Sequence, residues 1–331
     1  MLASLCLAGC DKGPAAVQLA GDTMGTTWHV TVINPPRDVP QEGLQRGIEE
    51  QLLKVNDSMS TYRDDSEISR FNAAAPYTWI PVSHDFYYVL STALRVGRQS
   101  QGAYDVSVAP LVELWGFGPK PGADALPTEQ LIADMLQRVG QDNIRLDDEV
   151  QAVMKLSDLS LDFSSLAKGY AVDVVAKWLA QQGISRALVE VGGEMKMSGM
   201  SGRGDPWRVA IERPDSGSRS VAAAISLTDN AVATSGNYRN YFEVDGKRYS
   251  HTIDPRTGRP VTHDLVSVTV VHSSAMLADA WATALTVLGA EQAMAVAQSQ
   301  GLAVYFIRST AGEFLHSHTA AFSGYLDGGQ P

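Results

Sequence analysis

The chain of 331 residues contains only two cysteines, and both lie within its first ten residues. Residues 11–331 therefore have no thiol, which excludes a cysteine nucleophile, a thiolate metal site and an internal disulfide there. No hydrophobic run approaches the roughly 20 residues that a membrane-spanning helix needs. The formal net charge is -11, and lysine and arginine form no cluster, so the sequence does not predict a nucleic-acid-binding protein.

The common nucleotide-binding and hydrolase motifs are also absent. The sequence contains no G-x-G-x-x-G after a strand, no G-x-x-x-x-G-K-[ST], no G-x-S-x-G and no H-E-x-x-H. A nucleotide would therefore have to be recognised in another way. An acidic protein that binds an anion must concentrate positive charge locally, so the lysines and arginines that lie within motifs are informative.

The N-terminal residues differ in character from the rest of the chain. A short apolar run ends in Leu-Ala-Gly-Cys, which resembles the bacterial lipobox, where the cysteine becomes the lipid-modified first residue. We expect a lipoprotein signal over residues 1–10 with lipid on Cys10, a tether over residues 11–20, and a single domain of two packed lobes over residues 21–331. This predicts a protein anchored to the bacterial inner membrane and facing the periplasm; an ordinary buried N-terminus is the alternative.

Hydrophobic periodicity predicts helices and strands in mixed runs rather than in strict alternation, which is typical of an α+β fold. The expected helices cover residues 41–57, 85–99, 165–182, 275–288 and 291–300. The expected strands include residues 26–33, 159–163, 187–191, 194–197, 208–212, 231–235 and 265–271, and a closing strand over residues 302–307.

Residues 161–170 form the first candidate site. A strand is expected to end at Asp162, and a turn of small residues leads into a helix with Lys168 in its first turn. The free N–H groups and the dipole of a helix N-terminus favour an anion, and Lys168 adds a positive charge. An ordinary helix cap with a solvent-exposed lysine is the alternative.

Asp279 and Thr283 form the second candidate site. Their spacing of four places both side-chain oxygens on one face of a helix. A carboxylate and a hydroxyl suit Mg²⁺, which keeps few protein ligands and completes its coordination with water and phosphate. The alternative is a carboxylate that only charges the first turn of the helix.

His251 lies in a third segment, residues 249–260, where a strand runs into a turn rich in proline and glycine. A histidine there could act as a general base near neutral pH. A tight turn with a structural Asp254 is the alternative, but it does not account for the histidine.

Taken in order, these segments resemble the ApbE family of FAD:protein FMN transferases. The resemblance covers nearly the whole chain; its single motifs are only moderately specific, but the ordered set is strong. It is carried by residues 24–28, 60–63, 102–105, 167–173, 190–194, 234–236, 251–255 and 279–285.

The resemblance implies an ApbE-like α+β fold with FAD in a cleft between the two lobes. It implies that FAD is bound by Met24, Tyr62, Ala103, Tyr104, Asp105, Asp162, Lys168 and Ile253. It also implies a Mg²⁺ ion on Asp279, Thr283 and an oxygen of the turn at Ser165, with His251 and Lys168 as catalytic residues. Because many family members have glycine or alanine at the serine positions of that turn, a main-chain carbonyl is the safer ligand there.

The implied reaction attaches FMN to a threonine or serine hydroxyl of a target protein and releases AMP, so FAD is a substrate. The implied targets are exported flavoprotein domains of membrane-bound respiratory or electron-transfer complexes. Two alternatives remain open: a Mg²⁺-dependent FAD pyrophosphatase that makes FMN and AMP, and a periplasmic lipoprotein that binds FAD without chemistry.

Overall fold

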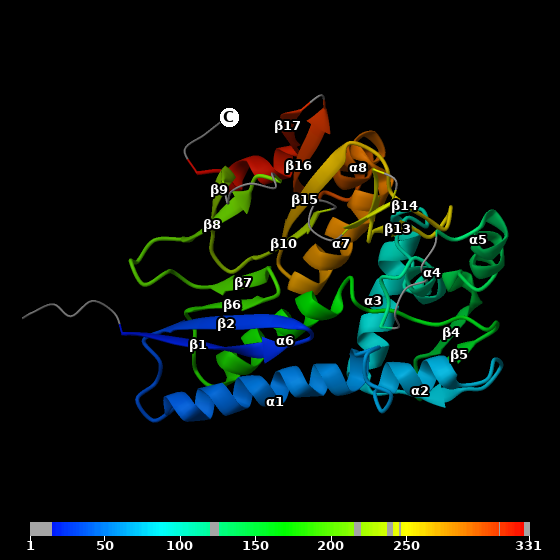
Figure 1. The fold of residues 1–331 in the computed structure, drawn as a ribbon. Helices are drawn as coiled ribbons and strands as arrows, with labels where there is room; N and C mark the ends of the chain where they lie inside the picture. Colours follow the sequence, from blue (N-terminus) through cyan, green and yellow to red (C-terminus); the bar gives the residue numbers. More distant parts are fainter. Residues whose placement is uncertain are drawn as a thin grey trace, which may run out of the picture.

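The computed structural model describes residues 15–119, 126–214, 220–236, 241–244, 246–310 and 312–327 (Figure 1). Its centre is an eight-stranded sheet in which every neighbouring pair of strands is antiparallel. The strands follow the order β1 (Ala16–Thr23), β2 (Thr26–Ile33), β6 (Ala187–Val191), β7 (Glu194–Ser198), β10 (Ala231–Gly236), β15 (Leu265–His272), β16 (Ala303–Thr310) and β17 (Glu313–His318).

Smaller sheets and helices surround this main sheet. The smaller sheets are β3 (Ile80–Pro81) with β5 (Ala152–Lys155) and β4 (Ile144–Asp147), β8 (Trp207–Glu212) with β9 (Val221–Leu227), β11 (Tyr241–Val244) with β12 (Lys247–Ser250), and β13 (Ile253–Asp254) with β14 (Arg259–Pro260). The helices are α1 (Gln41–Met59), α2 (Glu67–Ala73), α3 (His84–Gln99), α4 (Ala109–Leu114), α5 (Glu129–Leu136), α6 (Ala167–Gln181), α7 (Ala275–Leu288) and α8 (Ala290–Ser299), with 3-10 turns η1 (Gln141–Asn143) and η2 (Ala320–Tyr325).

The central strands of the main sheet are apolar on both faces, as expected for strands that are covered on both sides. In β16, Val304 and Phe306 pack into a core with α1, α3, α6 and α7, whereas Tyr305 and Ile307 pack into a second core with β8, β9 and η2. In Figure 1, α1 runs along β1 and β2 toward α2, and α4 and α5 group with β4 and β5 beside α3. This arrangement confirms the α+β class.

Most of the strongly periodic segments form the elements that the sequence predicts. The expected helices over 41–57, 85–99 and 275–288 correspond to α1, α3 and α7. The apolar stripe of α1 is buried as its spacing requires, at Leu44, Ile48, Leu52 and Val55. No described helix is long and apolar enough to cross a membrane.

The expected tether over residues 11–20 is wrong from residue 16 onward. Strand β1 begins at Ala16 and pairs with β2 along its whole length, from Ala16 opposite Ile33 to Thr23 opposite Thr26. Leu19 is buried against the main core. Because these residues are part of the sheet, the folded domain begins no later than Ala16; Cys10 lies outside the described residues.

Two expected strands also need correction. Residues 159–163 are buried except for the half-buried Ser160, but they form only one isolated bridge, because their backbone bonds with side chains and loops instead of a strand. The Asn72 side chain accepts from the Leu161 N–H and donates to the Leu161 carbonyl, at 2.7 and 2.9 Å. The strand expected over 302–307 does not close the fold, because β17 follows β16 at the edge of the sheet.

The close approach of α6 and α7 depends on a missing side chain at Gly169. A Cβ atom there would lie 2.3 Å from the Ala275 carbonyl oxygen and 2.8 Å from the Met276 Cα, both of which are backbone atoms that cannot rotate away. The Gly169 N–H also donates to Asp279 Oδ2 at 3.1 Å. The two helices can therefore pack this closely only with glycine at position 169.

We predict that Gly169→Ala destabilises the fold by about 1–3 kcal/mol through overpacking, although alanine is normally the better helix residue. Thermal unfolding should show a drop of several degrees in Tm. Gly324→Ala in η2 is the control, since a Cβ there meets nothing within 4 Å. An unchanged Tm for Gly169→Ala would contradict the packing argument.

Candidate functional site

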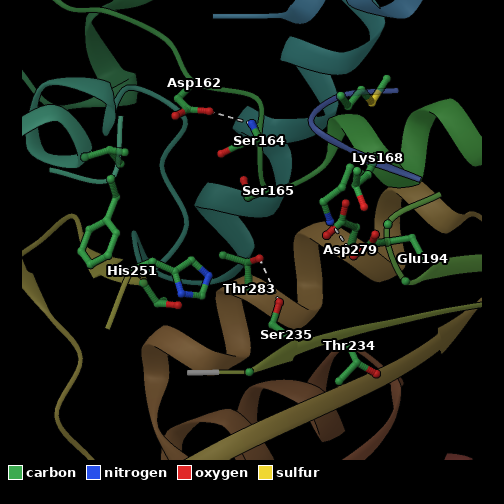
Figure 2. Close-up of a pocket in the computed structure, with 18 of the residues that line it drawn as sticks. Asp162, Ser164, Ser165, Lys168, Glu194, Thr234, Ser235, His251, Asp279 and Thr283 are labelled. Atoms are coloured by element: carbon green, nitrogen blue, oxygen red, sulfur yellow. Dashed lines mark hydrogen bonds and ion pairs between the residues drawn. The ribbon is translucent and has the colours of Figure 1, made fainter. Parts of the chain in front are cut away.

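A cavity of about 910 Å³ lies between the main sheet with α7 on one side and the segments around α4 and β13 on the other. Figure 2 shows labelled side chains from distant parts of the sequence pointing toward it. All twelve site residues that the sequence analysis names within the described ranges line this cavity: Met24, Tyr62, Ala103, Tyr104, Asp105, Asp162, Ser165, Lys168, His251, Ile253, Asp279 and Thr283.

The cavity reaches both faces of the main sheet because β7 and β10 separate there. These strands pair over only two residue pairs, and within the described part of the chain residues 233–236 have no partner on the β7 side. The Ser235 hydroxyl lies 3.2 Å from the Thr283 hydroxyl of α7, whereas the Thr234 hydroxyl bonds with that of Thr269 in the neighbouring strand. Successive strand residues point to opposite faces, so the gap connects the two sides.

The turn before α6 is held by short-range hydrogen bonds. Asp162 Oδ1 accepts from the Ser164 N–H at 2.7 Å, which tightens the turn. The Ser165 hydroxyl donates to the Tyr104 hydroxyl at 2.9 Å, so this side chain is engaged within the protein. Burial raises the pKa of Tyr104, so it remains a neutral phenol. The turn therefore holds the first residues of α6, including Lys168, at the cavity wall.

Lys168 lies beside buried carboxylates. Its Nζ donates to Glu194 Oε1 at 2.7 Å, and 30% of its side chain is exposed. Burial alone would lower the pKa of Lys168, but the charges of Asp279 and Glu194 outweigh burial and raise it. Lys168 is thus a fixed positive charge at neutral pH, placed at the first turn of α6, where the helix dipole also favours an anion.

Asp279 has almost no contact with solvent, since only 3% of it is exposed. Burial raises its pKa most, the charge of Glu194 raises it further, and Lys168 and the Gly169 N–H oppose the shift. A buried carboxylate in this position favours additional positive charge nearby. Thr283, four residues later on α7, lies between Asp279 and His251 in the view of Figure 2.

The residues around Asp279 fit Mg²⁺ by their chemistry. All the available donors are oxygens: the Asp279 carboxylate, the Thr283 hydroxyl and the main chain of the turn at Ser165. Such a set suits a hard ion that keeps several waters or phosphate oxygens. Among the described residues, no group of three or more His, Cys, Asp or Glu side chains is placed to hold a metal ion.

In Figure 2, His251 lies beyond Thr283 as seen from Asp279, and it belongs to the segment between β12 and β13. Its ring meets that of Phe117 edge-on, with centroids 6.3 Å apart. Ile253, two residues later, is buried in a small core with Leu111, Trp115 and Ile132. This packing fixes the backbone that presents His251 to the cavity.

Met24 and Tyr62 lie where the cavity opens. Tyr62 is 72% exposed. Met24 and Gly25 form the two-residue turn between β1 and β2, with φ of +50° and +69°. Hairpin turns of this kind usually carry asparagine, aspartate or glycine, and a methionine there is strained. Strain at a cavity mouth indicates a functional reason for the methionine side chain.

The Asp105 side chain stabilises its own loop, whereas the sequence resemblance implies that it binds FAD. Its Oδ1 accepts from the N–H and hydroxyl of Ser107, and its Oδ2 accepts from the Gln141 N–H at 2.9 Å. Burial raises the pKa of Asp105 despite these bonds. The carboxylate therefore holds the loop in which residues 103–105 line the cavity.

Sequence reasoning missed Glu194 as a functional residue. It entered only as the last residue of the segment 190–194, one of those that carry the sequence resemblance. A signal was present, because an acidic residue that begins a buried strand requires a partner. The partner, Lys168, is 26 residues away in sequence, and only the fold brings the two side chains together.

The chain is similar to known proteins along nearly its whole length. The ApbE family model matches residues 24–306. A protein of Vibrio cholerae named FAD:protein FMN transferase is 44% identical over 322 residues, covering 97% of this chain and 96% of that protein. The protein of the same name from Escherichia coli K12 is 40% identical over 338 residues, covering 98% and 96%.

Solved structures of proteins with similar names also resemble this chain in fold. The flavin transferase ApbE from Vibrio cholerae has a TM-score of 0.89 at 42% identity, covering 95% of this chain and 100% of that one. The apo form of the Pseudomonas stutzeri flavinyl transferase ApbE has a TM-score of 0.88 at 37% identity, covering 96% and 99%.

We predict that Met24→Asn weakens binding of FAD, the substrate that the sequence resemblance implies, while Tm stays equal or rises. Asparagine tolerates positive φ but cannot supply the apolar side chain. Flavin fluorescence titration and thermal unfolding measure the two effects. Tyr77→Asn is the matched control: Tyr77 also has positive φ (+62°) but does not line the cavity. Equal FAD affinity in both variants would remove Met24 from the binding site.

Proposed function

The chain belongs to the ApbE family, and from this we infer that it is an FAD:protein FMN transferase. The observation that supports this most directly is the cavity itself. It holds a fixed cation, Lys168, beside a buried carboxylate, Asp279, with a histidine at the other end of the same wall. This is the arrangement that transfer of a charged phosphoryl group to a hydroxyl requires.

The transfer exchanges a phosphoanhydride bond of FAD for a phosphoester bond to the acceptor. The hydroxyl oxygen of a threonine or serine in the acceptor protein attacks the FAD phosphorus nearer riboflavin. The bond from that phosphorus to the bridging oxygen of the pyrophosphate breaks, and its electron pair leaves with AMP. The hydroxyl proton is released, and FMN remains joined to the acceptor through a phosphoester.

The chain contributes position and charge to this step. Lys168 offsets negative charge on the pyrophosphate, and the α6 N-terminus adds to its effect. Mg²⁺ held by Asp279, Thr283 and a main-chain oxygen of the turn at Ser165 would supply further neutralisation of the pyrophosphate and of the departing AMP. Met24, Tyr62, Ile253 and the backbone of residues 103–105 bind and orient the rest of FAD.

His251 is proposed to take the proton of the acceptor hydroxyl. It lines the cavity from the segment between β12 and β13, on the side away from Lys168 in Figure 2. A general base must reach the proton that it removes, and an imidazole accepts one near neutral pH. The acceptor hydroxyl would accordingly enter from the His251 side of the cavity.

The cellular setting is proposed from the sequence. A lipid on Cys10 would hold the protein on the periplasmic side of the inner membrane, since several acyl chains together give stable anchoring. Acceptors would then be exported flavoprotein domains of membrane-bound respiratory or electron-transfer complexes.

The test uses the protein without its first ten residues, incubated with FAD, Mg²⁺ and an exported flavoprotein domain. The proposal expects AMP release coupled to an acceptor mass gain of one FMN. FMN and AMP released at the same rate without an acceptor would instead identify an FAD pyrophosphatase. Binding of FAD without any product would leave a flavin-binding protein.

We predict that Asp279→Asn lowers the rate of AMP release at least about 100-fold, because the isosteric amide cannot offer a charged ligand to the metal. Chromatographic measurement of AMP over a range of Mg²⁺ concentrations follows the loss. Asp134→Asn, on the exposed surface of α5, is the matched control and should retain the full rate. Full activity of Asp279→Asn would remove this residue from the metal site.

We predict that His251→Ala slows FMN transfer by roughly 10²- to 10⁴-fold, the usual contribution of a general base. The affinity for FAD should change by less than about threefold, because His251 is proposed to act on the acceptor hydroxyl and not to bind FAD. Rapid-mixing transfer assays and FAD titration separate the two quantities. Transfer at the wild-type rate, or a loss of FAD affinity large enough to account for the slower transfer, would contradict this assignment.

A further inference from the structure

Glu194 has one carboxylate oxygen without a protein partner. The side chain begins β7, lines the cavity and is only 5% exposed. Its Oε1 accepts from Lys168 Nζ at 2.7 Å, whereas its Oε2 is buried and has no hydrogen-bond partner among the described residues. A buried carboxylate oxygen that lacks a partner is costly, so a group that donates to it is expected in the working protein.

Glu190 shows how the chain satisfies a carboxylate that has only a structural role. It lies on the neighbouring strand β6 and does not line the cavity. Its Oε1 accepts from the Gly193 N–H at 2.6 Å, and its Oε2 bonds with His29 Nδ1 at 2.7 Å. The open oxygen of Glu194 is therefore not a general feature of acidic residues in this region.

The turn before Glu194 is made of two glycines with different surroundings, and both line the cavity. Gly193 has φ of +103°, and a Cβ there would meet nothing within 4 Å. Gly192 is confined instead, because a Cβ would lie 2.8 Å from Thr26 Cγ2 and 3.0 Å from Lys168 Cδ. Gly192 thus lets Lys168 pass closely, whereas a Cβ at the exposed Gly193 would contact no residue other than its chain neighbours.

We propose that Glu194 Oε2 accepts a hydrogen bond from a sugar hydroxyl of FAD while Oε1 holds Lys168. This inference rests on the proposed function, which places the pyrophosphate beside Lys168. The groups that flank the pyrophosphate in FAD are the ribityl chain and the ribose, and both carry hydroxyls. A phosphate oxygen is excluded as the partner, because it is an anion and would be repelled.

A mutant cycle separates this contact from the support that Glu194 gives to Lys168. Lys168→Met is compared with the double variant Lys168→Met/Glu194→Met, which replaces the buried pair by apolar side chains of similar length. If Glu194 also binds a hydroxyl, the double variant should bind FAD roughly 10- to 100-fold more weakly than the single variant. Equal affinity would show that Glu194 only supports Lys168 and would overturn the proposal.

A second comparison does not depend on the folding of those variants. Glu194→Gln keeps the shape of the side chain but loses its charge, and Glu190→Gln is the matched control. Binding of FAD, ADP and FMN is measured by calorimetry with Mg²⁺ present. A selective loss for ADP in Glu194→Gln identifies the ribose as the source of the hydroxyl, and a selective loss for FMN identifies the ribityl chain.

Other outcomes contradict the proposal. An equal effect of Glu190→Gln would mean that only the local charge matters. A change in Mg²⁺ affinity without a change in FAD affinity would assign Oε2 to the metal. The wild-type transfer assay runs in parallel: absent transfer together with a Glu194-dependent loss of FAD affinity would refute the proposed function and leave the contact with FAD intact.

Discussion

The buried charge of Asp279 is the constraint on which the rest of this structure depends. A carboxylate near the N-terminal end of a buried and largely apolar helix is strongly unfavourable unless positive charge and N–H donors surround it. The fold supplies both from α6, through Lys168 and the Gly169 N–H. The two helices must therefore pack closely at the point where α6 begins, and glycine at position 169 permits that distance.

The position of α7 is secured by a second carboxylate. Asp173 of α6 accepts from the Ser274 hydroxyl and the Met276 N–H at the N-terminus of α7, and from Lys196 of β7. Three elements are thus connected through one partly buried side chain. These contacts stabilise the packing of α7 against α6, and they also fix the positions of Asp279 and Thr283 on α7. A substitution that weakens them would therefore change both the stability of the fold and the geometry of the site.

The sequence predicted well wherever local periodicity and tertiary contacts agree. The helix stripes of α1, α3 and α7 are examples, and the motif positions around Lys168, His251 and Asp279 do line one cavity. Prediction was poor where a partner lies far away in the chain. Residues 159–163 have the composition of a strand, but the N–H and carbonyl of Leu161 bond with the side chain of Asn72, 89 residues earlier, instead of with a neighbouring strand. Glu194 was missed for the same reason, because only the fold shows that it shares Lys168 with Asp279.

Strand β1 begins at Ala16, only six residues after Cys10. If Cys10 carries lipid, as we propose, a chain of six residues reaches at most about 20 Å, less than the diameter of a small domain. The enzyme could then not extend far from the bilayer, and a partner fixed in the same membrane would be met by lateral diffusion. Confinement of both proteins to one thin layer raises their local concentration and offsets a weak affinity between them.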